Sequence, residues 1–130
     1  MSSKDFRQDK HPVARLDFAQ ATWASGVTAA VVKTMEVNGV VEQIAVKVND
    51  NTGNRTATVT ITDENGATLF SEASIAENAT TTYFARSYKG TPDADFNPFL
   101  AVGTLTATIT PSGDPGASGM TVDLYLYLVK

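Results

Sequence analysis

The segment RTATVTITDENGATLF, residues 55–70, decides the fold class of this chain. Threonine occupies every second position from 56 to 62, and the positions between hold Ala57, Val59 and Ile61. Side chains of a β-strand point alternately to opposite faces, so this pattern predicts a strand with one apolar face and one hydroxyl face. Turn residues follow at 63–66, and a second strand pattern begins at Thr68. The segment therefore predicts a β-hairpin.

The length of the hairpin loop sets which residues oppose each other. A three-residue loop, Glu64-Asn65-Gly66 with Gly66 in the left-handed region, places Ile61 opposite Leu69 and Thr62 opposite Thr68. A two-residue loop at Asn65-Gly66 would instead oppose Val59 to Glu72 and Thr62 to Leu69, which mixes the two faces. We therefore expect the three-residue loop, with Phe70 on the threonine side. The expected inner face consists of Ala57, Val59, Ile61, Leu69, Ala73 and Ile75.

The first half of the chain predicts a second hairpin. Residues 27–37 and 40–48 are rich in valine, and Asn38-Gly39 between them is a strong signal for a two-residue turn. In the later strand Ile44, Val46 and Val48 fall on one face. The alternation predicts one buried side and one wet side for that strand.

Three more segments complete the β pattern. Residues 79–87, ATTTYFARS, predict a strand of about six residues. Residues 89–103 predict a long connection with room for one helical turn, anchored by Phe96, Phe99 and Leu100. Residues 104–110, TLTATIT, repeat the alternation of threonine with apolar residues seen at 56–62, and we call each of these two stretches a threonine rib. The final strand from Met120 is expected to turn Val122, Leu124, Leu126 and Leu128 inward and Tyr125 and Tyr127 outward.

Seven or eight short strands with regular turn signals predict an all-β fold, an antiparallel β-sandwich or jelly roll, with a barrel as the competing closure. A chain of 130 residues is long enough for one core, so we expect a single domain over residues 14–130. Residues 1–13 lack apolar periodicity and are expected to form an extended N-terminal arm.

Charge and composition exclude several classes of function. Residues 1–15 carry four cationic and two anionic side chains, net +2, and the other 115 residues carry six and twelve, net −6. No basic cluster is interleaved with aromatic residues, so nucleic acid is not an expected partner. No apolar run is long enough for a membrane span or a secretory signal, and the absence of cysteine excludes disulfides.

The sequence offers no arrangement that predicts catalysis. The one histidine, His11, lies beside Pro12 in the expected arm, where no pocket would orient it. Residues 116–119, GASG, lack the spacing of a nucleophile elbow. Oxygen ligands at 50–54 or at Asp93 and Asp95 do not match a calcium loop. We expect no enzyme activity, no metal and no cofactor.

The threonine ribs admit three interpretations. Threonine suits an exposed strand, so the simplest is a solvated face. Neither rib carries a charged residue between its threonines, so a flat, uncharged docking face is the second. The third, ice binding, requires a regular array over many equivalent strands, whereas this chain has two unrelated strands and no repeat. The aromatic residues, Trp23 and the tyrosines among them, also leave open a carbohydrate-binding platform.

Residues 53–70, GNRTATVTITDENGATLF, and 103–129, GTLTATITPSGDPGASGMTVDLYLYLV, together with the polar arm, resemble the small β-sandwich virion proteins of tailed bacteriophages, most of all the head decoration or cement proteins. The resemblance implies a non-enzymatic virion protein that binds the major capsid protein or other virion proteins. It also implies assembly in the bacterial host cytoplasm without secretion. Self-association, as a trimer, stays open.

We expect the arm to dock, because a disordered basic segment that orders on binding can wrap a large surface. The residues expected to contact the partner are Phe6, Arg7, Lys10, Arg15, Trp23 at the exit of the arm, Phe70, Tyr125 and Tyr127. The alternative function is a carbohydrate-binding or host-adhesion β-sandwich module.

Overall fold

The computed structural model describes residues 13–85 and 99–129, which form seven antiparallel strands and no helix. The strands are β1 (Val13–Trp23), β2 (Val31–Val48), β3 (Ala57–Thr62), β4 (Thr68–Ile75), β5 (Ala79–Phe84), β6 (Phe99–Pro111) and β7 (Met120–Val129). The chain is therefore an all-β protein, as the alternating patterns predict. The expected arm, apart from its last residue, and a stretch of the expected long connection lie outside the described residues.

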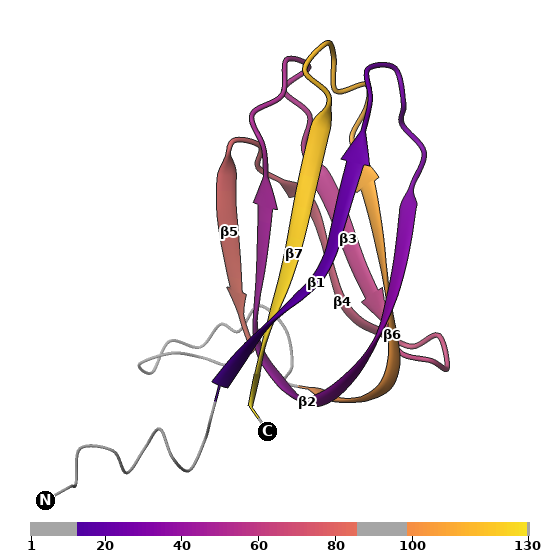
Figure 1. Cartoon of the computed structure of the whole chain (residues 1–130), viewed down its shortest axis with the longest axis vertical. Coiled ribbons are helices and arrows are strands. Elements are labelled where there is room, and N and C mark those ends of the chain that lie inside the picture. Colours follow the sequence, from indigo (N-terminus) through magenta and orange to yellow (C-terminus); the bar gives the residue numbers. More distant parts are fainter. Residues whose placement is uncertain (1–12, 86–98, 130) are drawn as a thin grey trace, which may run out of the picture.

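The strands form two packed layers joined by the long strand β2 (Figure 1). The first half of β2 pairs with β6, which continues to β3 and β4. The second half of β2 pairs with β7 on one side and with β5 on the other, and β7 continues to β1. We call β5, the second half of β2, β7 and β1 the front layer, because they lie nearer the viewer in Figure 1, and the other strands the back layer.

The predicted hairpin turn at Asn38-Gly39 is wrong. Both residues lie inside β2, which runs through them as one strand of 18 residues. Gly39 has a φ of 147° and pairs with the fully buried Ala101 at the point where β2 passes from one layer to the other. Because β6, β7 and β5 supply partners to the two halves of β2, those halves have no need to pair with each other.

The hairpin of residues 57–75 combines the two registers that the sequence offered. Thr62 pairs with Thr68 and Gly66 has a φ of 87°, as predicted for the longer loop. A bulge next to this pair then shifts the register, so that Ile61 pairs with Phe70 and Val59 with Glu72. Phe70 is consequently buried at 3% exposure, and its predicted place on the threonine side is wrong; Ala73 is exposed and Leu69 only half-buried.

One apolar core fills the space between the layers. The inward residues of β6 and β7 are all buried, as the alternation predicts: Leu105, Ala107, Ile109, Val122, Leu124, Leu126 and Leu128. β7 is a central strand, which explains why both of its faces are rich in large side chains. Strand β1, which the sequence did not suggest, adds Phe18, Ala21 and Trp23 to this core.

The two ends of the sandwich differ in construction. At the end drawn uppermost in Figure 1, the loops 24–30, 49–56 and 112–119 are joined by hydrogen bonds. We call it the loop end. At the opposite end β2 crosses between the layers, and Val13, Ala85, Phe99 and Val129 all lie close to this crossing. We call it the bend end. Both described ranges, 13–85 and 99–129, begin and end there.

Candidate docking surface

The two threonine ribs lie side by side on the outside of the back layer. Directly paired residues of neighbouring strands share a face, and Thr34, Thr106, Thr62 and Thr68 form one such row across β2, β6, β3 and β4. Further rows pair Thr108 with Thr60 and Thr110 with Thr58. We call this surface the threonine face: Thr34, Thr58, Thr60, Thr62, Thr68, Ser71, Thr104, Thr106, Thr108 and Thr110.

Apart from the row of Thr104, the rows of the threonine face carry no charged side chain. Thr60 Oγ1 and Ser71 Oγ lie 3.1 Å apart, so these two hydroxyls satisfy each other. Charge begins at the margin near the bend end, where Glu36 pairs with Thr104 and Glu64 accepts a hydrogen bond of 3.3 Å from the Thr104 amide. A partner could cover the centre of this face without removing an ion from water, which is the costly step in docking.

An aliphatic row adjoins the threonine face at the bend end. Val129 pairs with Val40 and Val40 with Leu100, so these three side chains share one outer face across β7, β2 and β6. Val102 lies two residues further along β6 on the same side. Leu100 and Val102 are 68% and 61% exposed, the highest values among the large apolar side chains of the described residues. We call Val40, Leu100, Val102 and Val129 the aliphatic stripe.

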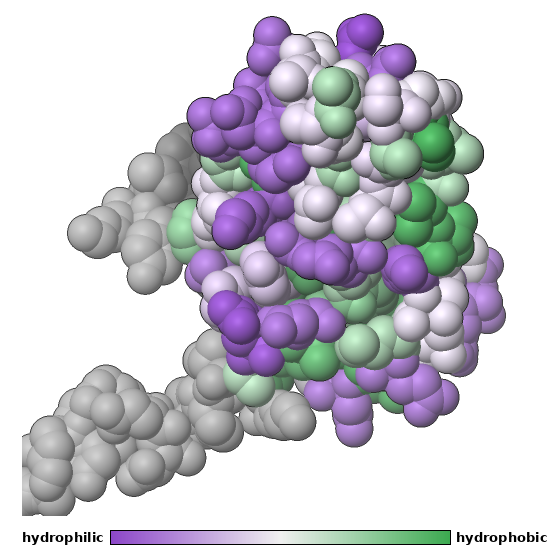
Figure 2. All heavy atoms as spheres, turned by 45° about the horizontal axis from the view of Figure 1, so that its top comes forward, coloured by the Kyte–Doolittle hydropathy of each residue, from purple (hydrophilic) through white to green (hydrophobic). Residues whose placement is uncertain are grey.

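The outside of the front layer has a different character. Tyr125 and Tyr127 project from β7, and the Arg15 guanidinium lies 4.8 Å from the centre of the Tyr125 ring. Arg15 Nε also lies 3.0 Å from an oxygen of Asp17, and Gln20 donates a hydrogen bond of 2.7 Å to Asp123. We call this surface the tyrosine face. Hydrophilic residues are spread across the part of the molecule that Figure 2 brings forward.

The structure places the expected contact residues in three groups. Arg15, Tyr125 and Tyr127 come together on the tyrosine face. Trp23 and Phe70 do not belong to the surface: Trp23 is 3% exposed and donates a hydrogen bond of 2.7 Å to the Ala29 carbonyl, and the Phe70 ring packs edge-on against Tyr83. The third group, Phe6, Arg7 and Lys10, lies outside the described residues.

These positions weaken the alternative of a carbohydrate platform. A sugar ring stacks on an open aromatic face. Trp23 and Phe70 are buried, and one face of the Tyr125 ring is covered by Arg15. The tyrosine face therefore offers less open aromatic surface than the number of aromatic residues in the sequence suggested.

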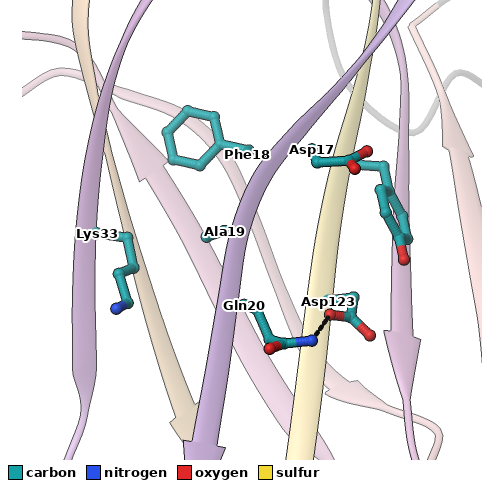
Figure 3. Close-up of a pocket in the computed structure, with 7 residues that line it drawn as sticks. Asp17, Phe18, Ala19, Gln20, Lys33 and Asp123 are labelled. Carbon is teal, nitrogen blue, oxygen red and sulfur yellow. Dashed lines mark hydrogen bonds between the residues drawn. The ribbon is translucent and has the colours of Figure 1, made fainter.

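A shallow depression of about 530 Å³ borders β1. It is lined by Asp17, Phe18, Ala19, Gln20, Lys33, Asp123 and Tyr125. Figure 3 shows Lys33 on the far side of β1 from Asp123, whose hydrogen bond with Gln20 is marked. Gln20 and Asp123 engage each other, and Asp17 is paired with Arg15. Within residues 13–85 and 99–129, no group of three His, Cys, Asp or Glu side chains could hold a metal ion.

The aliphatic stripe is the feature that the sequence interpretation missed. Leu100 was expected to anchor a long connection to the body, yet it lies in β6 and is largely exposed. A signal was present, because Leu100 and Val102 are in phase with Thr104, Thr106 and Thr108 at a spacing of two. Extending the outward rib toward the N-terminus of the strand would have placed both side chains outside.

The comparisons with known proteins give similarity of fold. No protein-family model and no curated protein matches the sequence. Among solved structures, the chain is similar to one in the cyanophage Pam1 capsid asymmetric unit, at 14% identity and a TM-score of 0.46, over 92% of this chain and 85% of that one. It is also similar to the Yersinia pseudotuberculosis-derived mitogen, at 8% identity and a TM-score of 0.42, over 91% and 86%.

A chain of infectious bursal disease virus, Gx strain, is similar at 8% identity and a TM-score of 0.44 over 93% of this chain. The present chain spans about a third of the length of that viral chain, 32%. The cyanophage capsid, infectious bursal disease virus and the mitogen score alike, so these similarities do not separate one function from another. The described residues form no helix long and apolar enough to cross a membrane.

Proposed function

We propose that this protein is a non-enzymatic structural protein of a bacteriophage virion, of the head decoration or cement type. In this proposal it docks on the capsid lattice through its N-terminal arm and the threonine face. The observation that carries the proposal is the threonine face itself, where four neighbouring strands contribute one uncharged surface. The sequence resemblance to phage virion proteins supports the same assignment.

The chemistry of the threonine face suits a lattice partner. Exposed sheet surfaces that stay solvated usually carry lysine or other charges, which discourage association. The rows of this face carry methyl and hydroxyl groups instead, and these can pack closely and exchange hydrogen bonds with water for hydrogen bonds with a partner. A weak contact of this kind becomes strong when many copies bind one shell, since each further contact is effectively intramolecular.

Opposite charge on the two parts of the chain supports a role for the arm. Residues 1–12 carry a net charge of +1, and residues 13–130 carry a net charge of −5. An acidic shell surface would attract the arm and repel the charged parts of the body, so the uncharged threonine face would turn toward the shell, because complementary charge steers encounter and fixes orientation. The arm would then supply orientation and the threonine face contact area.

The test is co-sedimentation of the purified full chain with assembled empty shells. Two lysines on the threonine face, Thr60→Lys with Thr106→Lys, should weaken binding by tenfold or more, since each buries a charge against the shell. The matched control is Thr82→Lys, on the outer side of β5 in the front layer, which should bind as the parent does. If the double variant saturates shells at the parent affinity, the threonine face is not the docking surface.

The arm is tested in the same assay. Charge reversal by Arg7→Glu with Lys10→Glu should reduce binding and make the remaining binding less sensitive to salt, because steering by opposite charge is screened by ions. Unchanged affinity and unchanged salt dependence would remove the arm from the proposal. Absence of fixed-stoichiometry binding by the parent chain would remove the virion role as a whole.

A further inference from the structure

The aliphatic stripe begins beside the root of the arm. Val13, the first described residue, pairs with Val129, and the row continues through Val40 to Leu100. Neighbouring strands lie about 4.8 Å apart, so three strand spacings put Leu100 about 14 Å from Val13. The stripe therefore starts at the point where residues 1–12 join the body.

The arm is long enough to cover this distance with slack. Residues 1–12 span up to about 40 Å when extended, and the seven peptide steps from Phe6 to Val13 span up to about 25 Å. Phe6 can therefore reach Leu100 and Val102 even if the chain reverses direction after Val13. No described segment covers these two side chains, which are 68% and 61% exposed. Contiguous exposed apolar side chains of this kind commonly mark a contact site.

The margin of the stripe is acidic, and the arm is basic. Glu36, Val37, Asn38, Val102 and Gly103 line a depression of about 310 Å³ at the bend end. The Glu64 carboxylate lies against Gly103, where a Cβ atom would come within 2.6 Å of its Oε1. Two carboxylates thus flank Val102, while Phe6 is followed by Arg7 and Lys10 in the arm. An apolar side chain therefore lies next to charged side chains of opposite sign on the two surfaces.

We propose that, in the free protein, residues 1–12 lie across the aliphatic stripe of their own chain. Phe6 contacts Leu100 and Val102, and Arg7 lies toward Glu36 and Glu64. The same chain is the favoured source of the arm, because a tethered segment has an effective concentration in the millimolar range for short flexible links. The contact stores the arm against the body until a partner competes for it.

This inference concerns the free chain and does not depend on the virion role, so the two can fail separately. The test uses the full chain with a single nitroxide label at Gln8→Cys, which is specific because the sequence has no other cysteine. Paramagnetic broadening of methyl signals is measured in dilute solution. We expect several-fold stronger broadening at Leu100 and Val102 than at Val27, an exposed valine at the loop end. Equal broadening at the three residues overturns the proposal.

A mixture of copies identifies the source of the arm. One copy carries the nitroxide and natural-abundance methyl groups, and the other carries isotopically labelled methyl groups without a nitroxide. We expect no broadening at Leu100 or Val102 in this mixture. Broadening there as strong as within one chain would mean that the stripe receives the arm of a second copy, which overturns the proposal in its stated form.

Substitutions test whether the stripe is the seat of the arm. Leu100→Ser with Val102→Asn in the labelled chain should reduce the broadening at Val40 and Val129 relative to the labelled chain without these substitutions. The matched control is Val32→Asn, which changes a 58% exposed valine near the other end of β2. The control should leave the broadening unchanged, and undisturbed methyl spectra of the core verify the fold of both variants. Broadening at Val40 and Val129 as strong as in the chain without these substitutions would falsify the assignment.

Discussion

The loop end and the bend end of the sandwich differ in whether their surface groups have partners within the molecule. At the loop end, three loops distant in sequence hold each other by hydrogen bonds: Asp114 Oδ1 accepts from the amides of Gly26 and Gly116 at 2.8 and 2.9 Å, and Arg55 Nε donates to the Asp114 carbonyl at 3.0 Å. At the bend end, apolar side chains of three strands reach solvent in one row. The polar groups of the loop end thus have hydrogen-bond partners within the molecule, whereas apolar side chains of the bend end are exposed to water.

This difference indicates where the molecule can bind. Polar groups that already have partners gain little from a new neighbour, because each exchange replaces one hydrogen bond by another. Exposed Leu100 and Val102 gain by leaving water whatever their present partner. Contacts at the loop end therefore stabilise the folded chain. Burial of the bend end and the adjoining threonine face against a partner would instead stabilise a complex.

The largest expected contrast is between Asn51 and Leu100. Asn51 is 2% exposed, its Oδ1 accepts from the Arg55 amide at 2.7 Å, and its Nδ2 donates to the Arg55 carbonyl at 3.1 Å. Asn51→Ala leaves both backbone groups without that partner and should lower the free energy of unfolding by about 3 kcal/mol. Leu100→Ser should change it by less than about 0.5 kcal/mol. Urea unfolding measures both, and equal losses would contradict the division of roles between the ends.

A glycine at each end gives a smaller contrast. Gly116, at the loop end, and Gly66, in the β3–β4 loop, have φ values of 85° and 87°. Alanine at either position costs about 1–2 kcal/mol for the left-handed conformation. A Cβ at Gly116 would also meet Thr52 Oγ1 and the Gly53 amide, whereas nothing lies within 4 Å of one at Gly66.

Gly116→Ala should consequently destabilise the protein by about 1 kcal/mol more than Gly66→Ala, through forced displacement of the neighbouring loop. Thermal and urea unfolding of the two variants check the difference. A loss at Gly66 as large as that at Gly116 would show that close packing between the loops is not what holds the loop end together.

The smallest effect is a dependence on pH. Hydrogen bonds from the backbone amides of Gly116 and Gly26, with a contribution from the charge of Arg55, hold the pKa of the Asp114 carboxyl below its ordinary value. Its contribution to stability is therefore present above the unfolded pKa of about 3.9 and is lost as the pH falls through the lower folded pKa.

Asp114→Asn should remove this dependence, so the difference in unfolding free energy between parent and variant should shrink as the pH is lowered from 6 to about 3. Acid titration of the two proteins under equal urea provides the measurement. A difference that grows on acidification would reverse the sign and exclude the proposed role of the Asp114 carboxylate in joining the loops.

The parts of the fold that could be predicted are those set by local alternation. The inward residues of β3, β6 and β7 follow from a spacing of two. Only one of the two possible orientations of each strand places its apolar residues in the core. Predictions failed where pairing with distant strands overrode a local signal. Asn38-Gly39 has the composition of a tight turn, but each half of β2 finds its partners elsewhere.

The same division applies to the candidate surface. Each threonine rib could be recognised in the sequence. The pairing of β6 with β3, which sets Thr60 beside Thr108, could not be predicted from it. Phe70 was misplaced because a single bulge in β4 turns its ring into the core. Trp23 lies in a strand that the sequence did not suggest, and its side chain is buried there.

By itself, the sequence determined the β class and which face of each strand carries its threonines, because these depend on spacing along one strand at a time. It also determined the opposite net charges of residues 1–15 and 16–130, because these depend on composition alone. Only the tertiary structure decided that two ribs form one surface, that β2 joins two layers, and that an aliphatic stripe begins beside Val13. These features depend on which strands pair, and that choice is made by burying one common core rather than by any local signal.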